Sequence, residues 1–118
     1  MLRKLTEAQC RAAMASGEFD EGTRTAGGAV AIVLTQSWCP QWHWMRAWLE
    51  AEAAGAEILW IEYDLEPFFD EFRSWKEQVL GNDQVPYLRY YSGGVLKRES
   101  NYIDRSGFRR LLGIAAAR

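Results

Sequence analysis

The chain has 118 residues, of which 48% are hydrophobic and 14% aromatic, and its formal net charge is −2 at pH 7. This composition is that of one folded domain with a real core and excludes a disordered chain. The mild acidity, the scattered basic residues and the lack of an apolar leader or a run of roughly 20 apolar residues predict a cytoplasmic protein with neither nucleic acid nor membrane as a partner.

The first 28 residues predict a helix followed by a loop. Thr6 is a suitable N-cap, Gln9 stands three residues later as in a capping box, and Gly17 is suited to end the helix. Residues 17–28 are rich in Gly, Thr and acidic side chains, which is typical of a connecting loop. Cys10 is expected to pack in a face of this helix. Apolar residues recur at helical spacing at Leu5, Ala8, Ala12 and Ala15.

The core is expected from residue 29 to residue 118 and begins with a strand, a helix and a second strand. The run AVAIVL, residues 29–34, is apolar without alternation, which predicts a central strand covered on both faces. Pro40 suits the first turn of a helix, which Gly55 ends. Residues 57–64 predict the next strand, and the helix between the two is long enough for a parallel crossover.

The remaining residues predict a helix, a hairpin and a last helix. Pro67 opens the first of these helices and Gly81 closes it, and residues 85–103 form two β-rich runs joined by a glycine turn at 92–94. Asp104 is a suitable cap for the last helix. The apolar stripes of the two helices are Phe68, Phe72, Trp75 and Val79, then Phe108, Leu111, Leu112 and Ala115. The predicted fold is therefore α/β, a four-stranded mixed sheet of two parallel strands and an antiparallel hairpin, flanked by helices, with an extra N-terminal helix.

Three segments in this order of elements resemble the thioredoxin-like superfamily. They are SWCPQW at residues 37–42, YDLEP at residues 63–67 and VPYLRYYSGG at residues 85–94. The resemblance covers roughly residue 28 to the C-terminus. It implies a thioredoxin-like fold, thiol–disulfide exchange, and a cis peptide bond before Pro86. It also implies that Pro86 lies beside the active sulfur and that the backbone of Val85 is free to pair with an extended substrate.

Cys39 is the predicted catalytic residue. It stands where a strand meets a helix, and the unpaired N–H groups and positive macrodipole end of a helix stabilise a thiolate, the nucleophilic form of cysteine. We expect its sulfur to be open to solvent and close to Pro86. The alternative is a small buried hydrophobic residue, although the strand before Cys39 and Pro40 directly after it are not typical of that role.

The motif lacks the parts of a dithiol cycle. Trp42 occupies the position of the second cysteine, so no neighbouring thiol can resolve a mixed disulfide at Cys39. The resemblance places Val33 where dithiol thioredoxins usually bury an acid, and Trp60 where a lysine often accompanies it. Nothing in the sequence brings Cys10 within reach of Cys39. An external thiol is therefore expected to complete the exchange.

Other side chains near the thiol have two interpretations each. His43 follows Cys39 by one helical turn and is a candidate modulator of the thiolate, or else a solvated or packed histidine. Trp38 and Trp42 flank the thiol and are candidates for an apolar platform, whereas Trp44 and Trp48, four residues apart, predict packing. The predicted substrate-binding residues are Trp38, Pro40, Trp42, Val85 and Pro86.

Two functions remain open at this stage. The first is thiol–disulfide exchange through one nucleophilic cysteine, contributing to cell redox homeostasis, with a protein disulfide or a low-molecular-weight thiol such as glutathione as partner. The alternative is a non-catalytic thioredoxin-fold adaptor that binds a partner peptide or protein. We expect no cofactor, because one Cys and one His do not complete a zinc site and the C-G-F-S sequence of cluster-binding monothiol glutaredoxins is absent.

Overall fold

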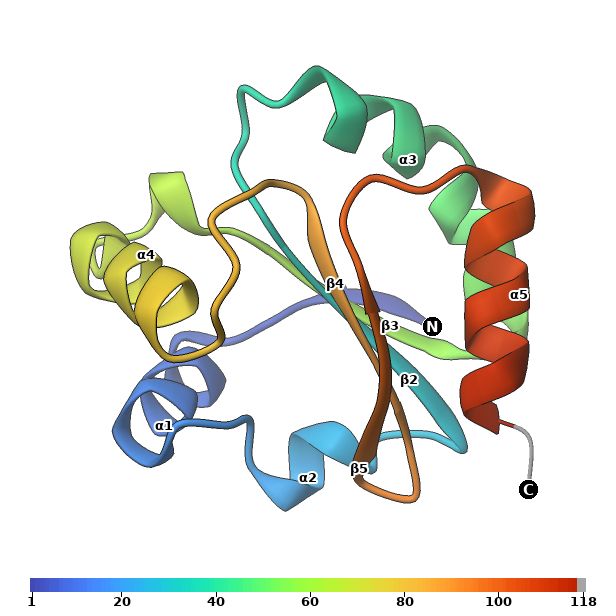
Figure 1. Ribbon diagram of the computed structural model, residues 1–118, viewed down its shortest axis with the longest axis horizontal. Coiled ribbons are helices and arrows are strands. Elements are labelled where there is room, and N and C mark those ends of the chain that lie inside the picture. Colours follow the sequence, from blue (N-terminus) through green and yellow to red (C-terminus); the bar gives the residue numbers. More distant parts are fainter. Residues whose placement is uncertain (117–118) are drawn as a thin grey trace.

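The computed structural model describes residues 1–116, with side chains to residue 113. The fold is a five-stranded sheet with helices on both faces (Figure 1). The strands are β1 (Leu2–Lys4), β2 (Ala29–Thr35), β3 (Glu57–Glu62), β4 (Tyr87–Ser92) and β5 (Val95–Ser100). The helices are α1 (Glu7–Ser16), α2 (Glu21–Arg24), α3 (Pro40–Glu52), α4 (Phe69–Gln78) and α5 (Arg105–Ala116), with short 3-10 turns at Ala53–Gly55 and Tyr63–Leu65. None of the described helices is long and apolar enough to cross a membrane.

The sheet is built around β2. The strand order is β1-β3-β2-β4-β5, and β2 pairs parallel with β3 and antiparallel with β4. Residues 30–34 of β2 are fully buried, which confirms the central strand predicted from the apolar run AVAIVL. The predicted hairpin is also confirmed, because β4 and β5 are antiparallel neighbours joined through Gly93 and Gly94, both at positive φ.

The predicted number of strands was wrong, because β1 makes the sheet five-stranded rather than four-stranded. Leu2, Arg3 and Lys4 pair parallel with residues 58–60 of β3 at the edge of the sheet. Three residues, two of them basic, contain no alternation that predicts a strand. Their extended conformation depends on the hydrogen-bonding edge that β3 offers.

The starts of α1, α3 and α5 follow the predicted caps. Thr6 and Gln9 form the expected capping box of α1, α3 begins at Pro40, and the Asp104 carboxylate accepts a hydrogen bond of 2.7 Å from the Gly107 amide at the start of α5. Helix α4, however, begins at Phe69 rather than Pro67 and ends at Gln78, and Val79, predicted on its apolar stripe, is exposed. The predicted apolar face of α1 was wrong, since its buried residues are Cys10 and Ala13 rather than Ala8, Ala12 and Ala15. The four-residue helix α2 was not predicted, and the side chain of Ala115 in α5 lies outside the described residues.

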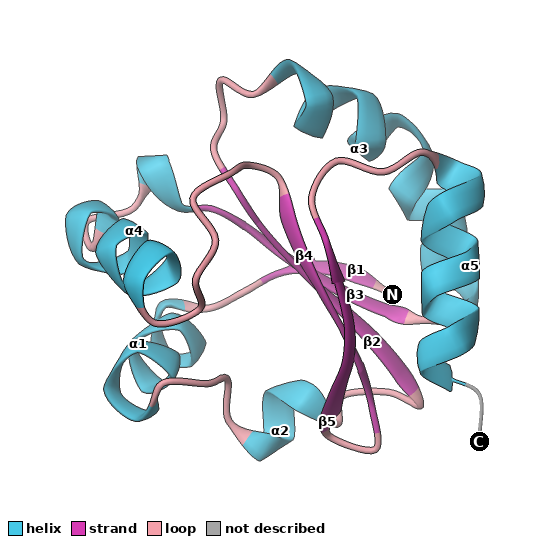
Figure 2. Ribbon diagram, in the orientation of Figure 1, coloured by secondary structure: helices cyan, strands magenta, loops and turns pink. Residues whose placement is uncertain are grey.

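The sheet separates two core layers (Figure 2). Helices α1 and α4 cover one face, where Ile32 and Leu34 of β2 point, and α3 and α5 cover the other, where Ala31 and Val33 point. Cys10 belongs to the α1/α4 layer, whereas Cys39 belongs to the α3/α5 layer. Both cysteines are free thiols.

Candidate thiol site at the start of helix α3

The turn that carries Cys39 is held by the segment after β3. The amide and the hydroxyl of Ser37 donate hydrogen bonds of 2.7 and 2.5 Å to the carboxylate of Asp64. The side-chain amide of Gln36 donates to the Tyr63 hydroxyl at 3.2 Å. Because β2 and β3 are parallel neighbours, their carboxyl ends meet at one edge of the sheet. The YDLEP segment therefore fixes the loop that leads into α3.

Cys39 is the N-cap residue of α3 and faces the segment before β4. Its backbone carbonyl accepts the first helical hydrogen bond, at 3.3 Å from the amide of His43. Its thiol donates to the carbonyl oxygen of Val85, with Sγ 3.7 Å from that oxygen, and the Val85-Pro86 peptide bond is cis. Residues 46 positions apart in the sequence are thus brought into contact at the end of the sheet.

The expectation of a solvent-open sulfur was wrong. Cys39 is only 3% exposed and lies in the core layer that contains Trp42 and Met45. The small side chain lies beneath its own turn, and the Val85 carbonyl faces the sulfur from the neighbouring segment. The segment around Val85 therefore covers part of the buried thiol.

His43 does not point its imidazole nitrogen at the thiol. Its Nε2 lies 2.6 Å from the carbonyl oxygen of Ser37, to which it donates a hydrogen. The side chain is exposed, and within the described residues no hydrogen bond joins it to the Cys39 side chain. This placement fits the solvated histidine of the two interpretations.

The tryptophans are arranged differently from the prediction. Trp42 is 1% exposed, and its indole N–H donates to the Glu62 carboxylate at 2.9 Å, so it offers no platform to a substrate. Trp44, predicted to pack, is 59% exposed and lies edge-on against Tyr102, with ring centroids 6.0 Å apart. Trp48 does pack, 5.5 Å from the ring of Phe108.

The remaining predicted contact residues lie on both sides of the buried sulfur. Trp38 is 63% exposed directly before Cys39, and its indole N–H donates to the side-chain oxygen of Gln36 at 2.6 Å. Pro40 is exposed at the first position of α3, whereas Pro86 is buried and Val85 is half-buried. The accessible parts of the site are therefore Trp38, Pro40 and the edge of Val85.

Most of the groups beneath the turn are apolar or aromatic. Val33 of β2 and Trp60 of β3 are direct partners in the sheet register. The indoles of Trp60 and Trp42 lie 6.0 Å apart, and the Arg46 guanidinium lies 5.8 and 5.7 Å from their ring centroids. Glu62 accepts from Trp42 and pairs with Arg46 at 3.5 Å. Thr35, two residues after Val33 on the same face of β2, is also fully buried, and its hydroxyl has no hydrogen-bond partner among the described residues.

No protein-family model matches the chain, and no curated protein matches it in sequence. Solved structures do match. A mutant thioredoxin from Halobacterium salinarum is 14% identical with a TM-score of 0.70, over 99% of this chain and 91% of that one. The short form of thioredoxin f from spinach chloroplast is 14% identical with a TM-score of 0.71, and the match covers 98% of this chain and 94% of that one. Oxidised thioredoxin O1 from Arabidopsis thaliana is 15% identical with a TM-score of 0.67, and the match covers 98% of each chain.

The chain has a thioredoxin-like fold. In this fold Trp42 stands where the motif would place a second cysteine, and the Val33 and Trp60 pair occupies the positions expected of an acid and a lysine. Cys10 cannot replace the missing thiol, because it is fully buried on the opposite face of the sheet from Cys39. The site therefore holds one sulfur, and the chain's other cysteine lies out of its reach.

Neither a metal site nor the groove near α5 belongs to the thiol site. Among the described side chains, no three His, Cys, Asp or Glu residues are grouped as metal ligands. A groove of about 300 Å³ between the ends of α3 and α5 is lined by Ala29, Glu52, Arg109 and Leu112, among others. Ala29 begins β2 whereas Cys39 follows its end, so the groove lies at the other end of that strand.

Two buried cations on the α1/α4 side of the sheet were not predicted from the sequence. Lys76 of α4 is 0% exposed and Arg89 of β4 is 5% exposed. A period of two in YLRYY places Arg89 on the same sheet face as Tyr87 and Tyr91, and this was the available signal. Lys76 carried no such signal, because a lysine among polar residues of an amphipathic helix is typical of its solvated face.

Proposed function

We propose that this chain is a thiol–disulfide exchange protein that acts in the cytoplasm through one nucleophilic cysteine, Cys39, and contributes to redox homeostasis. The contact between Cys39 Sγ and the Val85 carbonyl at the start of α3 carries this proposal. It combines a thiol at a helix N-terminus with a peptide segment whose backbone can recognise an extended chain. The match to solved thioredoxins supports it.

The chemistry needs three exchanges, in each of which a thiolate attacks a disulfide and the displaced sulfur leaves as a thiolate. The Cys39 thiol loses its proton to solvent, and the thiolate attacks one sulfur of a substrate disulfide. A bond forms between Cys39 Sγ and that sulfur, the original disulfide bond breaks, and the other sulfur leaves as a thiolate that takes up a proton. Cys39 is the N-cap residue of α3, at the positive end of the helix dipole.

The second exchange takes its thiol from outside the chain. Glutathione, as thiolate, attacks the mixed disulfide at the substrate sulfur, so that Cys39 leaves as a thiolate and the substrate is joined to glutathione. A second glutathione then releases the substrate thiol and forms glutathione disulfide. The burial of Trp42 at the second-cysteine position is consistent with this dependence on an external thiol.

Substrate binding is assigned to the accessible surface around the sulfur. Trp38 and Pro40 offer apolar contact on one side, and the backbone of Val85 before Pro86 offers hydrogen bonds on the other. Approach of a substrate strand to Val85 displaces the carbonyl from Cys39 and uncovers the sulfur. We assign His43 a structural role, because its ring donates a hydrogen bond to the Ser37 carbonyl in the turn before α3.

A matched pair of cysteine variants tests the proposal. Glutathione-dependent reduction of a glutathionylated peptide is measured for the wild type, Cys39→Ser and Cys10→Ser. We expect Cys39→Ser to lose roughly 100-fold or more of the rate, because the nucleophile is gone, and Cys10→Ser to retain it. Equal rates for wild type and Cys39→Ser, or no activity in either, contradict catalysis by this sulfur.

A thioredoxin-fold adaptor is the second candidate. The exposed Trp38, Trp44 and Tyr102 and the 3% exposure of Cys39 favour it, because large exposed aromatic side chains mark contact surfaces while a covered thiol is a slow nucleophile. An adaptor selects the same peptides from a displayed library with wild type and Cys39→Ser, and loses them with Trp38→Ser. Binding that requires the Cys39 thiol contradicts the adaptor.

A further inference from the structure

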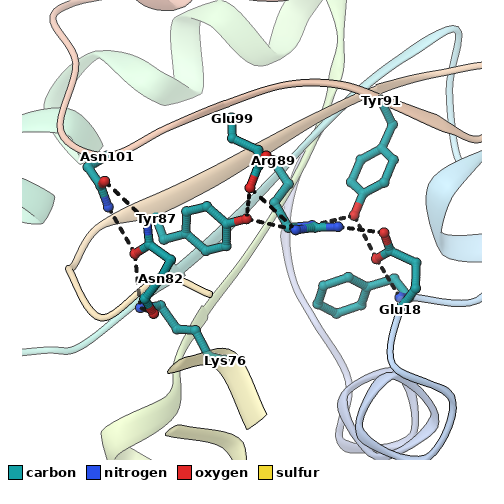
Figure 3. Close-up of polar contacts among 9 residues, drawn as sticks. Glu18, Lys76, Asn82, Tyr87, Arg89, Tyr91, Glu99 and Asn101 are labelled. Carbon is teal, nitrogen blue, oxygen red and sulfur yellow. Dashed lines mark hydrogen bonds and ion pairs between the residues drawn. The ribbon is translucent and has the colours of Figure 1, made fainter. Parts of the chain in front are cut away.

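The buried ammonium of Lys76 binds the segment that leads into Val85. Lys76 lies on α4 and is 0% exposed. Its Nζ donates to the carbonyl oxygen and the side-chain oxygen of Asn82 at 2.8 and 3.3 Å (Figure 3). It also donates to the carbonyl oxygen of Gln84 at 2.7 Å. All three acceptors belong to the segment between α4 and β4.

The charge of Lys76 is compensated mainly by neutral groups. Besides the three oxygens, it faces the ring of Tyr87, whose centroid is 5.5 Å from Nζ. Burial lowers the pKa of Lys76 to about 8, while the negative charges of Glu77 and Asp83 oppose this shift. The three directed hydrogen bonds of Lys76 specify where the segment lies. Removing the ammonium leaves the two backbone carbonyl oxygens without this donor, which costs stability as well.

Asn101, from the loop after β5, holds the same segment from the other side. Its side-chain amide donates to the side-chain oxygen of Asn82 and to the carbonyl of Pro86, both at 3.1 Å. The side-chain oxygen of Asn82 also accepts the amide of Gln84 at 3.0 Å. Figure 3 shows Asn82 between Lys76 and Asn101. Residues 82–86 are thus fixed on both sides of Val85, whose carbonyl faces Cys39.

We propose that Lys76 is a positioning residue for the thiol site, which holds residues 82–86 so that the Val85 backbone stays at the Cys39 sulfur. The expected effect of Lys76 on the exchange rate rests on the function proposed above, whereas its expected effect on the accessibility of the Cys39 sulfur does not. Lys76 reaches the sulfur through Gln84 and Val85 and touches neither the sulfur nor a substrate. Loss of its hydrogen bonds lets the Val85 carbonyl move away from Cys39.

Alkylation of the two cysteines in the folded protein tests this role. Lys76→Met keeps the length of the side chain and removes its donors, and Lys97→Met on the exposed face of β5 is the matched control. Iodoacetamide labelling is followed by mass spectrometry of the Cys39 and Cys10 peptides. We expect labelling of Cys39 to rise roughly fivefold in Lys76→Met with Cys10 unchanged, because only the cover of Cys39 is loosened. Lys97→Met should label as the wild type does.

Cys10 separates positioning from a general loss of structure. It is 0% exposed on the other face of the sheet, so general unfolding raises the labelling of both cysteines together. A parallel rise of both, or an unchanged Cys39 in a folded variant, overturns the proposal. If Lys76→Met does not fold, Lys76→Gln, which keeps N–H donors, is measured instead. A smaller rise confined to Cys39 supports the proposal, and no rise overturns it.

The exchange assay supplies the second measurement. If Cys39 is catalytic, Lys76→Met should lower the rate with a glutathionylated peptide roughly tenfold although the sulfur is more accessible, because the backbone that aligns the substrate is displaced. Opposite changes in labelling and in exchange are not expected from a purely structural role. A wild type without exchange activity contradicts the proposed function, while the labelling pattern still decides the role of Lys76.

Discussion

The two faces of the sheet bury similar aromatic residues but treat charge and thiols differently. The α1/α4 face holds Cys10 and, at the same sheet surface, the guanidinium of Arg89 with its tyrosine partners. The α3/α5 face holds Cys39 and Trp42 in a layer without a buried charge among the described residues. The α1/α4 face thus carries a hydrogen-bonded network around Arg89 beside apolar residues, whereas the α3/α5 face is apolar and includes the Cys39 thiol.

Two cysteines with nearly equal exposed fractions have different surroundings in this fold. Cys10 and Cys39 are 0% and 3% exposed. Burial, followed by the negative charge of Glu66, raises the pKa of Cys10 to about 12, and the residue lies within helix α1. Cys39 lies at a helix start and faces one carbonyl of a connecting segment. The residues that surround each sulfur, rather than its exposed fraction, therefore separate Cys10, a buried helix residue, from Cys39, the candidate nucleophile.

The largest expected effect comes from breaking the charge network on the α1/α4 face. The Arg89 guanidinium donates to the hydroxyls of Tyr87 and Tyr91, each at 2.7 Å, and to Glu18 at 2.6 Å (Figure 3). Arg89→Met should lower the free energy of unfolding by about 3 kcal/mol, because it leaves buried polar partners unpaired. Urea denaturation measures the loss.

The same variant checks that the two faces are independent. Below the unfolding transition, labelling of Cys39 in Arg89→Met should match the wild type, and Arg98→Met on the exposed surface should leave both stability and labelling unchanged. Faster labelling of Cys39 in a folded Arg89→Met would show that the network on one face controls the thiol on the other.

Alkaline pH should affect the Cys10 face through its thiol. The pKa of Cys10 is about 12 in the folded chain against 9.0 for an ordinary thiol, so the unfolded state loses its proton first. This group therefore contributes stability that is complete below pH 9 and declines as the pH rises toward 12. Between pH 9 and 10.5 the wild type should lose about 2 kcal/mol more than Cys10→Ala.

Urea titrations of both proteins at several pH values measure this difference. The buried tyrosines are common to both, so their titration cancels in the comparison. A difference between wild type and Cys10→Ala that stays constant from pH 8 to 10.5 would argue against a thiol held neutral by burial.

On the α3/α5 face, Trp42→Phe tests whether the indole is structural. The variant keeps an aromatic ring and removes the hydrogen bond to Glu62, and it should lower the free energy of unfolding by about 1–2 kcal/mol. Trp44→Phe, at an exposed position on the same helix, should stay within about 0.5 kcal/mol of the wild type. Equal costs at the two positions would contradict the observed burial of Trp42.

The smallest expected effect is at the N-cap of α1. Thr6 accepts from the amide of Gln9 at 3.1 Å, and the Gln9 side chain accepts from the Thr6 amide at 2.9 Å. Thr6→Ala should cost about 1 kcal/mol in thermal or urea unfolding and leave Cys39 labelling unchanged. A change in Cys39 labelling would show that α1 is coupled to the thiol site.

Local patterns predicted the elements that depend on their own residues. The apolar run of β2, Pro40 at the start of α3, the capping box at Thr6 and the glycine turn of the hairpin each act through neighbours in sequence, and the structure confirms them. Edge strand β1 was missed because its pairing partner lies more than 50 residues away. Within α3 the buried stripe is Trp42, Met45 and Leu49, so the identity of a tryptophan did not predict its side of the helix.

Sequence patterns were enough to predict that a thiol stands at a strand-to-helix turn, with Trp42 three residues after it, and that Pro86 precedes a hairpin. They did not predict that the Val85 carbonyl faces Cys39, that Trp42 is buried while Trp44 is exposed, or that Lys76 binds the segment before β4. The physical reason is that burial and hydrogen-bond partners are set by segments that meet across the sheet. A local pattern predicts the turn at Cys39, but it does not predict that the Val85 carbonyl, 46 positions away, lies against the sulfur.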